Sequence, residues 1–211
     1  MKWLERLLGG GDTALLLSQR YVVIDVETTG LRPYDDRLLA IGAVVVADGA
    51  VRLAETFDEV LHQDTPSAIE NILVHGIDGT AQTGGRAAAE VLSELVRFAG
   101  SSPLVAYHAD FDRVFIERAM RPALRTTLPN EWLDLARLAP AFFPEHAGDA
   151  QTLDDWCACF GIDNYARHDA VADAFATAQL LQVVLARSAE RGLTRYAELV
   201  QHERAQRWLE R

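Results

Sequence analysis

The chain has 211 residues, of which 49% are hydrophobic and 24% are charged, so it fits a single globular α/β domain. No stretch reaches the roughly 18 uninterrupted apolar residues of a membrane span, and the first residues lack the features of a signal peptide, so we expect a cytoplasmic protein with no membrane partner. The formal net charge of −11 argues against broad electrostatic gripping of long DNA, because phosphate affinity depends on Lys and Arg.

The scarcity of lysine and cysteine narrows the chemistry further. Lys2 is the only lysine, whereas P-loop ATPases and Schiff-base enzymes need one at their active sites. No G-x-S-x-G sequence occurs, which argues against an α/β-hydrolase. The two cysteines, Cys157 and Cys159, are too few and too close together for a structural zinc site or a disulfide framework.

The hydrophobic pattern predicts a run of strands followed by alternating helices and strands. Apolar runs rich in β-branched residues predict one strand that begins at Tyr21 and four more at 38–46, 51–61, 104–107 and 131–135. Three- and four-residue spacing and capping residues predict helices at 1–10, 66–73, 86–98, 111–120, from Thr152 onward, at 170–190 and at 193–211. This order indicates a mixed sheet with helices on both faces.

The first strand ends in two acids followed by the turn Thr28-Thr29-Gly30. Side chains two apart on a strand share a face, so Asp25 and Glu27 are expected to lie together at its tip. Two adjacent carboxylates repel each other unless a cation neutralises them, and Mg²⁺ or Mn²⁺ prefers such oxygen ligands. Taken alone, a solvated strand end is the more common explanation of this pattern.

Further candidates follow other predicted elements. Asp112 comes just after the strand at 104–107, and ligands of α/β sheets gather at the carboxyl ends of strands. His168 and Asp173 are five residues apart, about 140° around a regular helix. They can converge only if His168 lies at or before the first turn while Asp173 points inward.

These motifs together resemble the DEDDh 3′–5′ exonucleases of the DnaQ-like family. Asp25-Val26-Glu27-Thr28-Thr29-Gly30-Leu31 is similar to the first exonuclease motif, Phe111-Asp112 to the end of the second, and His168-x-Ala170-x-x-Asp173 to the third. Weaker similarities are His75-Gly76-Ile77, Leu133-Asp134-Leu135, and Leu153-Asp154 leading to Phe160-Gly161-Ile162. The resemblance covers roughly residues 20–186 and implies an RNase H-like fold with a five-stranded sheet in the order 3-2-1-4-5.

The resemblance also implies roles for individual residues. Four carboxylates would hold two Mg²⁺ or Mn²⁺ ions, and a histidine would act as general base on the attacking water; the implied residues are Asp25, Glu27, Asp112, Asp173 and His168. The implied contacts to the terminal nucleotide are Thr28, Thr29, Gly30, Leu31, His75 and His108. His108 departs from the family, which usually has an asparagine there, and this places substrate preference in doubt.

We therefore expect a metal-dependent 3′–5′ exonuclease that acts on single-stranded or frayed DNA ends and releases nucleoside 5′-monophosphates. An exoribonuclease trimming short RNA and a non-catalytic polymerase-associated binding subunit are the alternatives, and a DNA polymerase subunit is a candidate partner. The expected organisation is an N-terminal helical extension at 1–19, an exonuclease domain at 20–190 and a C-terminal helix at 191–211 packed on that domain. The sequence leaves the oligomeric state open.

Overall fold

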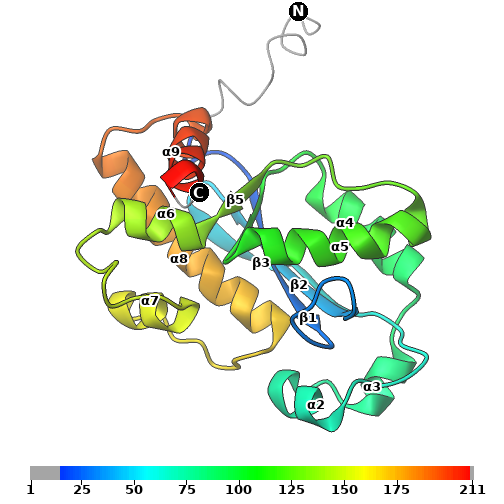
Figure 1. Cartoon of the computed structure of the whole chain (residues 1–211). Helices are drawn as coiled ribbons and strands as arrows, with labels where there is room; N and C mark the ends of the chain where they lie inside the picture. The colour runs from blue at the N-terminus through cyan, green and yellow to red at the C-terminus, as the bar shows by residue number, and fades with distance from the viewer. Residues whose placement is uncertain (1–14, 210–211) are drawn as a thin grey trace, which may run out of the picture.

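The computed structural model describes residues 15–209 and is built around one five-stranded sheet (Figure 1). Its strands are β1 (Tyr21–Thr28), β2 (Leu38–Ala47), β3 (Ala50–Val60), β4 (Leu104–Ala106) and β5 (Trp132–Asp134). They lie in the order β3-β2-β1-β4-β5; β2 is antiparallel to both β1 and β3, whereas β1, β4 and β5 are parallel. The predicted mixed sheet and its strand order are confirmed.

Eight helices are labelled in the described part of the chain, and two of them were not predicted. They are α2 (Ile69–His75), α3 (Gly79–Gly84), α4 (Ala88–Ala99), α5 (Ala109–Leu124), α6 (Leu135–Phe142), α7 (Leu153–Phe160), α8 (Ala170–Glu190) and α9 (Tyr196–Leu209). The unpredicted helices, α3 and α6, have only 6 and 8 residues. Helices this short show less than three turns of apolar spacing, and each begins after an aspartate cap.

Several helix boundaries also differ from the predictions. Helix α2 begins at Ile69 rather than residue 66, and α5 continues beyond 120, through Pro122, to Leu124. Arg125 closes α5 in a left-handed conformation, with its N–H donating to the carbonyl oxygen of Arg121 at 3.0 Å. The helix predicted at 1–10 lies outside the described residues, and Leu15 at the start of the described chain forms an isolated antiparallel bridge with Arg195.

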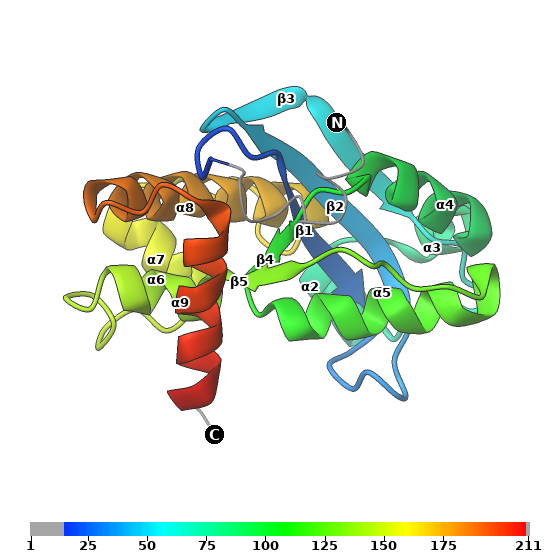
Figure 2. The ribbon, with the colours of Figure 1, turned by 90° about the horizontal axis from the view of Figure 1, so that it is seen from above.

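Alternating side chains on the sheet create a hydrophobic core on each of its two faces. Tyr21 and Val23 of β1 belong to the core formed with α6, α7, α8 and α9, whereas Val22, Ile24 and Val26 belong to the core formed with α4 and α5. Figure 2 shows these two groups of helices on opposite sides of the strands. The period-two pattern of β1 thus fixes which of its residues face α8.

Helix α8 spans the first of these faces. With 21 residues and a mean hydropathy of 1.2, it is the one described helix that is long and apolar enough to cross a membrane. Most of its side chains are buried against β1, β2 and the neighbouring helices, and it includes Asp173 in its first turn. Packing inside this domain explains its composition.

The last helix packs on the same domain. Tyr196, Leu199 and Val200 of α9 are buried in the core that also contains α6. The hydroxyl of Tyr196 donates to Glu131 Oε2 at 3.1 Å. The first half of this helix therefore packs on the domain, whereas Trp208 near its end is 75% exposed.

Candidate active site

Three carboxylates converge at the carboxyl end of β1. Asp25 and Glu27 alternate along β1 in step with Tyr21 and Val23, so their side chains project from the same face of the sheet, which α8 covers. Asp173 reaches them from the first turn of α8. One oxygen from each of the three carboxylates lies within 4.8 Å of the other two, which fits the ligand set of a hard divalent cation.

The electrostatics of this group also favour a cation. Burial raises the pKa of Asp25 well above its ordinary value, and the nearby charge of Asp173 raises it further. Burial raises the pKa of Glu27 to about 9, with added contributions from the charges of Asp25 and Asp173. Carboxyl groups that resist ionisation in this way gain their full charge when a positive ion binds between them.

Asp112 approaches the same strand tip from the opposite side. It is buried in the first turn of α5, and the backbone of Val26 in β1 acts to lower its pKa. Burial raises its pKa, and the charge of Asp25 raises it further. Asp112 therefore lies within electrostatic reach of Asp25, although it is not one of the three carboxylates within 4.8 Å.

The segment before α8 brings His168 and Asp173 together. His168 has a φ of 61° and precedes the helix, which is capped by Asp169. The N–H of His168 donates to Asp173 Oδ2 at 3.0 Å, while its side chain lines the cleft. His168 and Asp173 converge in the way that their five-residue spacing requires.

Two residues that were not predicted also hold Asp173. The side-chain amide of Asn164 donates to Asp173 Oδ1, and Arg167 Nη1 donates to the same oxygen at 3.0 Å. Arg167 Nε also pairs with Asp154 Oδ1 at 2.7 Å. The guanidinium of Arg167 is thus a cation of the chain itself beside the carboxylate group.

Gly42 allows α8 to begin so close to the sheet. It pairs with Asp25 across β1 and β2. A Cβ at this position would lie 2.2 Å from the carbonyl carbon of Ala170 and 2.3 Å from the nitrogen of Val171, and neither backbone atom can move cheaply. A glycine inside an apolar strand is a sequence signal for such a close approach, and the prediction did not use it.

The carboxylates line a cleft of about 600 Å³. Of the predicted substrate contacts, those that line it are Thr28, Gly30, Leu31, His75 and His108, and His168 does so too. Thr29 is not among the lining residues: its hydroxyl accepts from the N–H of Arg37 at 2.9 Å and lies 3.3 Å from Asp36 Oδ1. Thr29 stabilises the loop at 29–37 that forms one side of the cleft.

His75 and His108 lie in different environments on the cleft wall. His75 is buried, its Nδ1 accepts from the N–H of Ile77 at 3.0 Å, and burial lowers its pKa. His108 is exposed and has a φ of 65°, a left-handed conformation that Asn and His adopt more readily than most residues. The histidine therefore keeps the backbone geometry that the family's asparagine suits.

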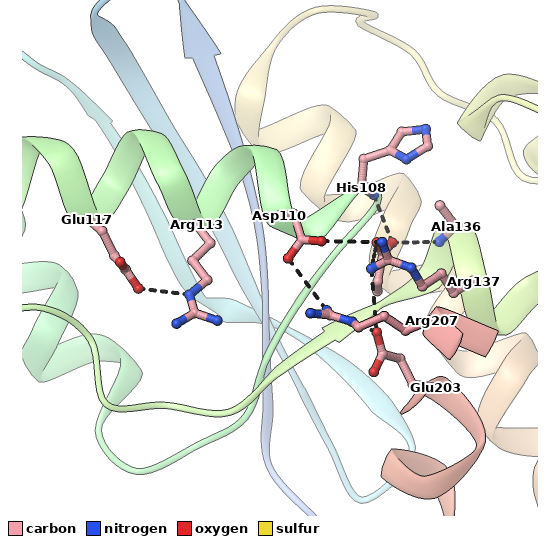
Figure 3. A network of polar contacts seen from close by, with 9 residues as sticks. His108, Asp110, Arg113, Glu117, Ala136, Arg137, Glu203 and Arg207 are labelled. Carbon is pink, nitrogen blue, oxygen red and sulfur yellow. Dashed lines mark hydrogen bonds and ion pairs between the residues drawn. The ribbon is translucent and has the colours of Figure 1, made fainter. Parts of the chain in front are cut away.

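A second network holds the turn at His108 (Figure 3). The N–H groups of His108 and Ala136 both donate to Oδ1 of the buried Asp134, each at 3.0 Å. Arg137 Nη1 donates to Asp134 Oδ2 at 2.9 Å and lies 3.6 Å from Glu203 of α9. Asp134 was recognised only as a weak motif similarity, and local sequence patterns gave no signal for its partners on α6 and α9.

Arg207 of α9 completes this network. Its Nη2 lies 3.3 Å from Glu203 Oε1 and 3.5 Å from Asp110 Oδ1 (Figure 3). Asp110 belongs to the first turn of α5 and also pairs with Arg137 at 3.3 Å. The C-terminal helix is thereby connected to the turn that carries His108 and to the helix that carries Asp112.

Comparison with known proteins assigns the fold and the family. A protein-family model described as "Exonuclease" matches residues 22–181. A DNA polymerase III subunit epsilon-like protein of Rhodobacter capsulatus is 33% identical over 202 residues, which cover 92% of this chain and 28% of that protein. The PolC-type DNA polymerase III of Bacillus subtilis is 30% identical over 186 residues, which cover 88% of this chain and 13% of the polymerase.

Solved structures agree in fold. E. coli exonuclease I in complex with a dT13 oligonucleotide matches with a TM-score of 0.69 and 18% identity, over 82% of this chain and 42% of that one. The chain spans less than half the length of these relatives. The strand order, the acidic cluster and the extended family match converge: the chain belongs to the exonuclease family, among the DnaQ-like 3′–5′ exonucleases with an RNase H-like fold.

Proposed function

We propose that this protein hydrolyses single-stranded or frayed DNA from the 3′ end and releases nucleoside 5′-monophosphates. The observation that carries the proposal is the group of three carboxylates within 4.8 Å, at the wall of a cleft that His168 also lines. The printed names of the relatives, a polymerase III epsilon-like protein and an exonuclease I bound to an oligonucleotide, support DNA as the substrate class.

The residues fit a divalent metal centre. Asp25, Glu27 and Asp173 would hold the ions, with Asp112 as a fourth acidic residue behind β1. The raised pKa values of Asp25 and Glu27 reflect burial and negative charge that the described residues do not fully neutralise. Mg²⁺ or Mn²⁺, two per site as in the family, would supply the positive charge that stabilises the attacking and leaving oxygens of the phosphodiester.

The chain's own groups would move the proton and seat the strand end. His168 takes a proton from water as the water oxygen bonds to phosphorus and the bond from phosphorus to the 3′ oxygen breaks. The hydrogen bond from the backbone N–H of His168 to Asp173 holds the histidine beside the carboxylates. Thr28, Gly30 and Leu31 line the same cleft and would contact the terminal nucleotide.

The test is digestion of a 5′-labelled oligonucleotide with and without Mg²⁺ or Mn²⁺, with Asp25→Ala as the inactive control. We expect a ladder of products shortened from the 3′ end, and no cleavage of a circular single strand, because a circle offers no end. A wild-type protein that produces no ladder with either ion contradicts the proposal. RNA of the same sequence, assayed in parallel, tests the exoribonuclease alternative.

Two further alternatives concern catalysis and partners. A non-catalytic binding subunit predicts retention of the oligonucleotide without cleavage in the same assay. Association with a polymerase rests on the names of the relatives, and co-purification that is lost on deleting 193–211 would support docking through α9. The burial of Tyr196 and Leu199 means that this deletion also exposes core, so the comparison needs a folded variant altered only at exposed positions of α9.

A further inference from the structure

A second groove lies beside the cleft, on the other side of the loop at 29–37. Its volume is about 450 Å³, and its lining includes Arg37, Arg118, Leu61, Phe115 and Pro122. Two segments connect it to the cleft. The loop lines the cleft with Leu31 and the groove with Arg37, and α5 lines the cleft with Phe111 and the groove with Phe115 and Arg118. From Phe111 to Arg118 the helix rises about 10 Å.

Two arginines of this groove are held in place without losing their charge. Arg37 Nη2 donates to the carbonyl oxygen of Thr65 at 2.9 Å. Arg118 donates to the carbonyl oxygens of Tyr34 at 3.1 Å and Asp36 at 3.2 Å. Within residues 15–209 neither guanidinium forms an ion pair. Carbonyl oxygens orient a guanidinium but do not neutralise it.

Arg191 is held in the same way, by the carbonyl oxygens of Ala141 and Phe142, but most other arginines of the described residues pair with acids. Arg86, for example, pairs with Glu59 and Glu94, both at 2.7 Å. Asp36 also lines the groove, but its Oδ2 accepts from the N–H of Arg32 at 2.8 Å and its Oδ1 lies 3.3 Å from the Thr29 hydroxyl. In a chain with a net charge of −11, fixed and unpaired arginines beside the cleft are a site for a polyanion.

The loop also presents bare apolar and aromatic surface between the cleft and the groove. Leu31 is 81% exposed and Tyr34 is 84% exposed. The guanidinium carbon of Arg118 lies 5.6 Å from the centroid of the Tyr34 ring. Proteins that bind single strands combine backbone-tracking cations with exposed aromatic rings on which bases stack, and both occur here within one loop and one helix.

We propose that this groove binds the nucleotides that precede the last two at the 3′ end, with Arg37 and Arg118 contacting phosphates and Tyr34 stacking on a base. The inference rests on the proposed function, because the strand would enter the groove from the cleft. It reconciles the acidic net charge with a nucleic-acid substrate: local cations grip a few nucleotides near the end. An acidic peptide would carry the same charge, but it would not require a groove that is continuous with the cleft, so this continuity favours a nucleic-acid strand.

The test compares Arg37→Gln with Arg52→Gln. Both substitutions remove one positive charge, but Arg52 lines neither the cleft nor the groove and pairs with Asp48 at 2.8 Å. Fluorescence anisotropy without divalent ions measures binding of a long single strand and of a dinucleotide. We expect Arg37→Gln to weaken long-strand binding about tenfold and to lower the slope of log affinity against log salt by about 0.7, as one lost phosphate contact predicts. Arg52→Gln is expected to leave both unchanged.

The proposal makes two more demands. Dinucleotide binding and hydrolysis should be unaffected by Arg37→Gln, and Arg37→Lys should restore long-strand affinity, because a phosphate contact needs mainly the charge. Equal losses in Arg37→Gln and Arg52→Gln, a parallel loss on the dinucleotide, or equal competition by polyglutamate would overturn it. A wild type that binds the long strand in this way yet cleaves nothing would contradict the proposed function and leave the groove supported.

Discussion

The molecule contains two buried acidic clusters near the same end of the sheet, and they differ in their counter-charges. At the cleft, Asp25, Glu27 and Asp173 converge with only Arg167 paired to one of them. At the junction of α5, α6 and α9, Asp134 and Glu203 are buried as deeply as Asp173. There Arg137 and Arg207 lie among the acids at distances of 2.9 to 3.6 Å.

This difference separates a structural cluster from a functional one. Burial raises the pKa of Asp134 as well, but the charge of Arg137 and the N–H groups of Ala136 and His108 oppose that shift. For Glu27, the charges of Asp25, Asp173 and Asp169 add to the effect of burial on its pKa, and the charge of Arg167 opposes it. An acidic cluster without sufficient cations of its own is poised to take them from solvent, so counter-charge distinguishes the two sites better than burial does.

Replacing Asp25 by asparagine should produce the largest effect, and on activity rather than stability. We expect exonuclease activity to fall at least 1,000-fold, roughly, since even partners outside the ligand set of a metal cost 10–100-fold when removed. The unfolding free energy in EDTA should not fall, because the substitution relieves repulsion. Single-turnover digestion measures the exonuclease activity, and urea denaturation of the same preparation measures the unfolding free energy. A clear loss of metal-free stability would assign Asp25 a structural role.

Replacing Arg137 by methionine should have the opposite effect. The substitution leaves the buried Asp134 without its ion-pair partner at 2.9 Å and leaves Glu203 paired with Arg207 alone. Breaking such a buried group costs about 3–5 kcal/mol of unfolding free energy. Turnover by the protein that remains folded should stay within about threefold of wild type, because the carboxylates of the cleft are untouched. Urea denaturation measures the unfolding free energy, and exonuclease kinetics at low temperature measure the turnover of the folded protein.

Arg113→Met is the matched control for that experiment. Arg113 pairs with Glu117 at 2.8 Å on the exposed side of α5, one helix turn apart (Figure 3). Exposed pairs of this kind contribute about 0.2–1 kcal/mol. If Arg113→Met and Arg137→Met were equally destabilising, the contrast between the buried network and an ordinary surface pair would be lost.

Gly42→Ala should damage the cleft through the backbone. The added methyl group meets the backbone of Ala170 and Val171, so the start of α8 must move and carry Asp173 away from Asp25. We expect a stability loss of about 1–3 kcal/mol, typical of overpacking, and a larger fractional loss of activity than of stability. Gly84→Ala is the control, because nothing lies within 4 Å of a Cβ there. Similar behaviour of the two variants would contradict this account.

Glu27 links the cluster to pH. Its pKa of about 9 in the folded protein lies above the ordinary value of 4.5, so the folded state keeps a proton that the unfolded chain loses. The contribution of Glu27 to metal-free stability should therefore be complete below about pH 4.5 and be lost as pH rises towards about 9, by up to about 6 kcal/mol at about 1.36 kcal/mol per pKa unit. Denaturation in EDTA across this range should show a flatter profile for Glu27→Gln, and saturating Mg²⁺ should oppose the loss by binding the ionised group. Equal slopes for both proteins would refute the assignment.

Much of the fold and part of the site could be predicted because they follow from short-range periodicity. The alternation along β1 placed Asp25 and Glu27 on one face, and the spacing of His168 and Asp173 correctly required a turn before α8. Thr29 illustrates a limit: a hydroxyl next to the motif can serve the substrate or the loop, and only the fold shows that it bonds to Arg37.

The counter-charges were beyond prediction for a different reason. Arg137 and Glu203 are 66 positions apart in the chain, and nothing in the helical pattern of either segment indicates the other. Arg167 resembles any surface arginine until Asp154 and Asp173 are seen on both sides of it. Sequence patterns therefore located the acids of the cleft and, as a weak similarity, Asp134, but they did not identify Glu203 and could not tell which acids were already neutralised.

Replacing His108 by asparagine should produce the smallest effect and test where the two clusters meet. Asp134 binds the N–H of residue 108, which every non-proline residue has, and asparagine accepts the left-handed conformation, so stability should change by less than about 0.5 kcal/mol. His108→Ala keeps the same N–H but disfavours this conformation and should lose about 1–2 kcal/mol. The side chain lines the cleft, so His108→Asn should shift the ratio of DNA to RNA cleavage a few-fold without changing thermal stability. An unchanged ratio would mean that the histidine serves the turn alone and that the neutralised cluster reaches the cleft only through the backbone.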